Sequence, residues 1–136
     1  MLLIIGHEAS LTGAPKSLLF FSHWVKENKG ERLCFILRNV GPLLAEYQKL
    51  GDVFLWELPH VDHSLSKRIF NRVFNSDQDR RAKFLNTIKK EVSIIYNNTC
   101  TNGSILEEVK ALIDKPLVSR IPELELVIQH YKMRGM

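Results

Sequence analysis

The chain has 136 residues, 45% of them apolar, and its 19 basic and 15 acidic residues give a net charge of +4. This composition is typical of a globular protein and excludes a disordered chain, and the length predicts one domain. No apolar run approaches the roughly 18 residues of a membrane span, and the apolar start is too short for a secretion signal. Cys34 and Cys100 are too few and too far apart for a disulfide framework or a zinc site. We therefore expect a soluble cytoplasmic protein, with Cys34 as a buried thiol.

Short apolar runs alternate with helical patterns along the whole chain. Apolar runs bounded by turn residues predict strands, and apolar residues spaced three or four apart predict helices. In chain order the elements are a strand at 2–5, a helix at 15–29, a strand at 33–37, a helix at 43–50, a strand at 53–56, helices at 66–74 and 78–90, a strand at 92–96, a helix at 103–113, a strand at 117–119 and a helix at 122–132.

This alternation of strands and helices predicts an α/β fold. We expect a Rossmann-like three-layer α/β/α domain with a parallel sheet of about five strands, spanning residues 1–136. The strands are continuously apolar, as in sheets that helices cover on both faces. Ligands of such sheets bind at the carboxyl ends of the strands. The loops of interest are therefore 6–14, 38–42, 59–64, 97–102 and 120–123.

The loop after the first strand contains glycines and a Lys-Ser pair, as phosphate-binding loops do. A Walker loop reads G-x-x-x-x-G-K-[ST], whereas here six residues separate Gly6 from Gly13, and Pro15 removes an amide from the cradle. The Rossmann pattern G-x-G-x-x-G is absent too. What remains is Thr12-Gly13-Ala14 at the start of a helix, where free amides and the helix dipole favour an anion. The alternative is a tight turn that needs a glycine.

Three stretches of the chain carry a family resemblance. They are IIGHEASLTGAPKSLL near the start, YNNTCTNGSILEEV around the end of the fourth predicted strand, and PLVSRIPELELVI near the end. The first resembles the SHEASRTGAP-like loop of glycosyltransferases of family 4, the retaining class with the GT-B fold. The second is similar to that family's NT-x-x-NG stretch, and the third to its P-x-[IV]-x-x-x-HELE stretch. Pro122 stands where that family has a histidine, and Gly6 where it usually has a serine.

The resemblance implies two Rossmann-like domains that face each other across a cleft. Residues 1–136 would form the N-terminal, acceptor-side domain of a larger enzyme, and we expect the nucleotide-sugar domain to be absent from this chain, which alone would be inactive. The implied reaction transfers a sugar from a nucleotide-sugar to a saccharide or lipid-linked acceptor, as in polysaccharide biosynthesis. The anomeric configuration would be retained, and neither a metal nor a cofactor would be required.

The resemblance also suggests roles for residues in the strand-end loops. Thr12, Gly13 and Ala14 would bind the donor diphosphate through backbone amides. His7 and Glu8 would orient acceptor hydroxyls in the catalytic centre. Candidates for binding the transferred sugar or the acceptor are Asn98, Thr99, Thr101 and Glu123. Helix capping and local turn hydrogen bonds are the alternative roles for all these polar residues.

A basic cluster lies between Ser64 and Glu91, where eight basic and three acidic residues give a net charge of +5. It reads as a solvated helix face, or as a surface that attracts anionic lipid at the inner membrane face or a phosphorylated acceptor. The residues expected at a peripheral membrane contact are Lys67, Arg68, Arg72, Arg80 and Arg81. We expect no nucleic acid partner, because no aromatic residue is placed between these charges to stack on bases.

Two other classes of function remain open. The chain could be a non-catalytic flavodoxin-like binding or regulatory module, or a basic module that binds membrane surfaces. The sugar, the nucleotide and the acceptor are not specified by the sequence.

Overall fold

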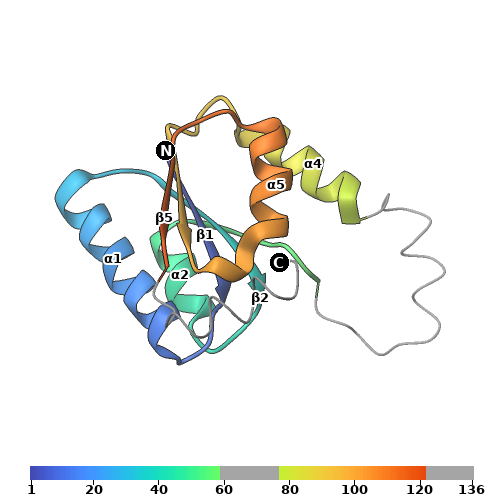
Figure 1. The fold of residues 1–136 in the computed structure, drawn as a ribbon. Coiled ribbons are helices and arrows are strands. Elements are labelled where there is room, and N and C mark those ends of the chain that lie inside the picture. The colour runs from blue at the N-terminus through green and yellow to red at the C-terminus, as the bar shows by residue number, and fades with distance from the viewer. Residues whose placement is uncertain (59–76, 122–136) are drawn as a thin grey trace, which may run out of the picture.

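The computed structural model describes residues 1–58 and 77–121. Its centre is a five-stranded parallel sheet with the strand order β3-β2-β1-β4-β5 (Figure 1). The strands are β1 (Leu2–Glu8), β2 (Leu33–Asn39), β3 (Asp52–Leu55), β4 (Ile94–Asn98) and β5 (Leu117–Arg120). The helices are α1 (Gly13–Lys29), α2 (Leu44–Leu50), α4 (Asp77–Ile88) and α5 (Gly103–Leu112), with a 3-10 turn η1 (Cys100–Asn102) before α5.

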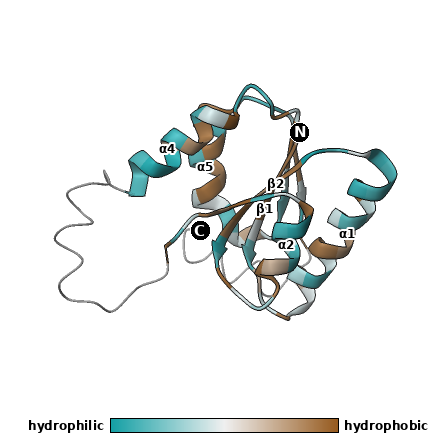
Figure 2. Ribbon diagram, turned by 180° about the vertical axis from the view of Figure 1, so that it is seen from behind, coloured by the Kyte–Doolittle hydropathy of each residue, from teal (hydrophilic) through white to brown (hydrophobic). Residues whose placement is uncertain are grey.

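Helices cover both faces of the sheet, which confirms the predicted α/β class and its three layers. Figure 1 shows α1 and α2 on one side of the strands and α4 and α5 on the other. Successive strand side chains point to opposite faces, so Ile4 and Phe35 pack toward α1 and α2, while Leu3 and Ile36 pack toward α4 and α5. Buried apolar residues lie on both faces of the sheet, and α4 is mostly hydrophilic (Figure 2).

Cys34 belongs to the core on the α4 and α5 side and is 1% exposed, which confirms the predicted buried thiol. Burial raises the pKa of this thiol to about 12. The group is therefore neutral and unreactive at physiological pH.

Element boundaries differ from the predicted ones at two places that matter for the site. The first strand continues to Glu8, so His7 and Glu8 are strand residues rather than loop residues. The fourth strand runs from Ile94 to Asn98 rather than over 92–96, so Asn98 is a strand residue too, while the Val92 N–H donates to the Ile88 carbonyl in the turn after α4. The helices predicted at 66–74 and 122–132 lie outside the described residues.

The strand order places a topological switch point between β1 and β4. From β1 the chain turns to α1 on one face, and from β4 it turns to α5 on the other face. The two connections diverge there and leave a crevice at the carboxyl ends of these strands, the usual ligand position in such sheets. The order 3-2-1-4-5 also differs from the 2-1-3-4-5 order of flavodoxin-like sheets. The flavodoxin-like topology of the alternative module is therefore wrong.

Candidate functional site

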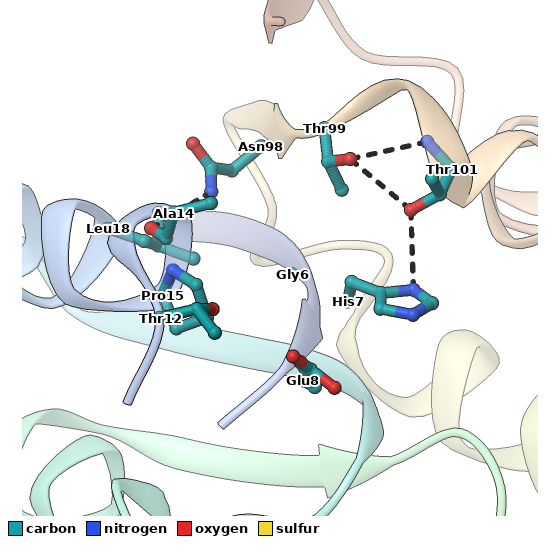
Figure 3. Close-up of a pocket in the computed structure, with 10 residues that line it drawn as sticks. All are labelled: Gly6, His7, Glu8, Thr12, Ala14, Pro15, Leu18, Asn98, Thr99 and Thr101. Atoms are coloured by element: carbon teal, nitrogen blue, oxygen red, sulfur yellow. Dashed lines mark hydrogen bonds between the residues drawn. The ribbon is translucent and has the colours of Figure 1, made fainter. Parts of the chain in front are cut away.

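A pocket of about 190 Å³ occupies the switch point between β1 and β4 (Figure 3). Its walls come from the end of β1, the start of α1 and the segment after β4. The lining residues are Gly6, His7, Glu8, Thr12, Ala14, Pro15, Leu18, Asn98, Thr99 and Thr101. Stretches some 90 positions apart in the sequence thus form one concave site.

The β1 side of the pocket carries an acid held by a neighbouring hydroxyl. Ser10 donates a 2.6 Å hydrogen bond to Oε1 of Glu8, and its hydroxyl lies 2.8 Å from that of Thr12. Glu8 is therefore fixed in position at the strand end. Ser10 is not among the residues predicted from the sequence, although its position between the candidates Glu8 and Thr12 was a usable signal.

The start of α1 offers backbone amides to the pocket. Thr12 is the N-cap, but its side chain makes no capping bond, and the first turn contains no acidic residue. The first amides of an α-helix have no acceptor within the helix, so those of Gly13 and Ala14 are available to a ligand. A Cβ atom built at Gly13 would meet no atom within 4 Å, which means that this stretch of backbone is open to approach.

The β4 side is a dense network of amides and hydroxyls. Nδ2 of Asn97 donates to the Thr99 carbonyl at 2.9 Å, and Nδ2 of Asn102 donates to Oδ1 of Asn97 at 3.0 Å. Both asparagine side chains are buried. Nδ2 of Asn98 reaches the Ala14 carbonyl at 3.4 Å, which joins the β4 side of the pocket to the start of α1.

His7 connects the two sides of the pocket. Its Nδ1 lies 3.3 Å from Oγ1 of Thr101, which in turn lies 3.2 Å from Oγ1 of Thr99. Figure 3 shows this row of three polar side chains, which runs from the β4 side of the pocket to the β1 side. The arrangement provides hydrogen-bond donors and acceptors next to each other, as recognition of a hydroxylated ligand requires.

Two arginines frame the strand ends and were not selected from the sequence, although both stand in loops predicted to lie at the carboxyl edge. Nη1 of Arg120, at the end of β5, donates to the Ser17 hydroxyl at 2.7 Å and approaches Oδ1 of Asn98 at 3.5 Å. Nη2 of Arg38, at the end of β2, donates to the Ser104 hydroxyl at 3.0 Å, and its Nε lies 3.9 Å from Glu57. Arg120 borders the pocket, whereas Arg38 ties β2 to α5.

The structure thus brings together the predicted candidates at positions 7, 8, 12, 14, 98, 99 and 101, and Gly13 stands between two of the lining residues. Glu123 lies outside the described residues, as do Lys67, Arg68 and Arg72.

Arg80 and Arg81, two of the residues expected at a membrane contact, pack against the end of β3. Arg80 donates to the carbonyls of Leu55 and Trp56, both at 2.9 Å, and lies over the ring of Phe54. Arg81 donates to the Trp56 carbonyl at 3.1 Å and pairs with Glu108 at 3.3 Å. These guanidinium groups hold α4 on the sheet, and a membrane contact through them stays a prediction.

Comparisons of the chain with protein-family models, with curated proteins and with solved structures find no match. Within residues 1–58 and 77–121, no helix is long and apolar enough to cross a membrane. In the same part of the chain, no group of three His, Cys, Asp or Glu side chains is arranged to hold a metal ion.

Proposed function

We propose that this chain is the acceptor-side domain of a retaining glycosyltransferase with the GT-B fold, as its resemblance to family 4 implies. The observation that carries the proposal is that two of the three stretches that resemble family 4 line the same pocket. The GHEASLTGAP stretch supplies one wall and the NNTCT stretch supplies the other. Two stretches of sequence that serve the same function are expected to lie close together in the fold. These two lie together at the switch point, where α/β sheets bind ligands.

The roles follow from the chemistry of each wall. The amides at the start of α1 would stabilise the negative charge that develops on the leaving nucleotide diphosphate. His7 and Glu8 would orient the acceptor hydroxyl, while Asn98, Thr99 and Thr101 would bind sugar hydroxyls. Glu123 remains a candidate for the same function. The nucleotide and most of the donor would be held by a second domain encoded beyond this chain.

The complete open reading frame that contains this chain provides the test. The purified product should transfer sugar from a nucleotide-sugar, and NMR of the product should show that the anomeric configuration is kept. Gly13→Asp should lower kcat/KM by at least about a hundredfold, the scale of losing one stabilising contact to a developing anion. A Cβ at Gly13 meets open space, so the protein should still fold.

Gly103→Asp is the matched control. Gly103 is also the first residue of a helix, α5, and a Cβ there also meets no atom within 4 Å. Its variant should keep full activity, because Gly103 does not line the pocket. Equal losses in both variants, or no transfer from any nucleotide-sugar, would contradict the proposal.

A further inference from the structure

Thr99 has a backbone conformation that side chains disfavour. Its φ is 128° and its ψ is 150°, and it is the one non-glycine residue with positive φ among residues 1–58 and 77–121. This region of backbone space is occupied almost only by glycine, and a β-branched residue there is a genuine outlier. Such strain persists only where the surrounding structure imposes it, and it concentrates at functional sites.

The surroundings hold Thr99 from several directions. Its N–H donates to the Arg120 carbonyl at 3.0 Å, and its own carbonyl accepts from the buried Asn97 at 2.9 Å. Its Oγ1 accepts the Thr101 N–H at 3.3 Å. Asn102 fixes Asn97 in turn. The buried amides therefore support the strained conformation, and a glycine at position 99 would keep both backbone bonds without the strain.

The conformation has a consequence in the pocket. It places Oγ1 of Thr99 in the row that continues through Oγ1 of Thr101 to Nδ1 of His7, at spacings of 3.2 and 3.3 Å (Figure 3). Hydroxyls both donate and accept, and so do the ring hydroxyls of a sugar, whereas the ionised oxygens of a phosphate only accept. The row therefore matches a polyhydroxylated ring better than an anion.

We propose that Thr99 is a sugar-binding residue, kept in a strained conformation because this aims its hydroxyl into the row with Thr101 and His7. The inference rests on the proposed function, and it specifies that this part of the pocket binds sugar hydroxyls. The binding role would explain why a threonine stands at position 99, although a glycine there would relieve the strain and make the folded chain more stable.

The stability test compares Thr99→Gly with Thr99→Ala in the purified 136-residue chain. Both variants lose the hydroxyl and differ in backbone freedom, and alanine is normally the more stable of the two. Here Thr99→Gly should melt about 4 °C or more above Thr99→Ala, because only glycine adopts φ of 128° without strain. Thr101, which has no positive φ, is the control, and at that position the alanine variant should melt higher.

The binding test uses NMR titration of the same chain with glucose, mannose, galactose and N-acetylglucosamine, and with inorganic phosphate for comparison. At least one sugar should shift the amide signals of Thr99 and Thr101. Thr99→Ser should bind that sugar as the wild type does, while Thr99→Ala and Thr99→Gly should bind at least about tenfold more weakly, the scale of one or two lost hydrogen bonds.

Three outcomes would overturn the inference: a Thr99→Gly variant less stable than Thr99→Ala, wild-type sugar affinity in Thr99→Gly, or binding of phosphate but of none of the four sugars. Neither readout involves a nucleotide-sugar or a transfer reaction. Failure of the transferase proposal would therefore leave both results standing, and failure here would leave the transfer assay unaffected.

Discussion

The guanidinium of Arg120 lies near the start of α1, with Nη1 2.7 Å from the hydroxyl of Ser17, the fifth residue of that helix. Arg120 is the one described arginine that no carboxylate of residues 1–58 and 77–121 approaches within 4.0 Å, since the other four pair with acidic side chains. A cation beside the positive end of a helix dipole is unfavourable on its own. An anion at this corner of the pocket would relieve that repulsion, which agrees with the proposed diphosphate position.

Arg120→Ala should therefore weaken binding of inorganic pyrophosphate to the chain by about tenfold, as expected for one charge-assisted hydrogen bond. Isothermal titration calorimetry at low salt measures this, because salt screens such interactions. Arg32→Ala is the control, since Arg32 pairs with Asp52 and Glu91 at the opposite edge of the sheet. Equal affinities for the wild type and Arg120→Ala would exclude a role for Arg120 in anion binding.

Gly41→Ala should destabilise the fold by about 1–3 kcal/mol, the scale of overpacking. A Cβ at Gly41 would lie 2.3 Å from the carbonyl oxygen of Ala9, so the loops after β1 and β2 would have to separate. The same carbonyl accepts the Leu43 N–H at 2.8 Å, and that bond would be disturbed too. Urea unfolding measures the loss. Gly13→Ala, in open space at a helix start, should leave stability unchanged or slightly raise it.

Tyr47→Phe tests how α2 positions the start of α1. The Tyr47 hydroxyl is buried and donates a 2.7 Å hydrogen bond to the carbonyl of Pro15, a residue that lines the pocket. The variant should lose about 1 kcal/mol of unfolding free energy, and the first hydrogen-bonded amides of α1, from Lys16 onward, should exchange faster in hydrogen-exchange measurements. Gln48→Ala, an exposed change on the same helix, should leave that exchange unaltered. Unchanged exchange in Tyr47→Phe would show that this bond does not position α1.

Stability should fall at alkaline pH because of Cys34. Burial raises the pKa of its thiol from its ordinary value of 9.0 to about 12, so above pH 9 the unfolded chain loses a proton that the folded chain keeps. Unfolding free energy then falls with rising pH by up to about 1.4 kcal/mol per pH unit. Burial raises the pKa of Tyr47 as well, from 10.0, so it adds to the slope only at still higher pH.

Urea midpoints at pH 8, 9 and 10 measure the slope, and Cys34→Ala should flatten it between pH 9 and 10, whatever that variant does to absolute stability. The same slope in Cys34→Ala and the wild type would assign the alkaline loss to other groups.

The class of fold was predictable because its signals are local. Continuous apolar runs such as Leu33–Leu37 form buried strands wherever helices cover both faces, and Gly30 ends α1 with the positive φ of 61° that favours glycine. Because ligands bind at the carboxyl ends of parallel strands, His7, Glu8 and Asn98 could be chosen as candidates without any knowledge of the strand order. Boundaries were less certain, because the end of β1 depends on pairing of Glu8 with Asn39 in the neighbouring strand.

Local patterns in the chain were therefore enough to predict the alternation of elements, the parallel sheet and the polar residues at one edge of it. The position of β1 next to β4 could not be predicted in this way, because strand order depends on long-range packing that no local pattern encodes. That adjacency joins His7 to Thr101 across 94 positions and brings Arg120 to the start of α1. The φ of Thr99 also depends on the tertiary structure, because the Arg120 carbonyl of β5 and the buried Asn97 amide hold it against the preference of the residue itself.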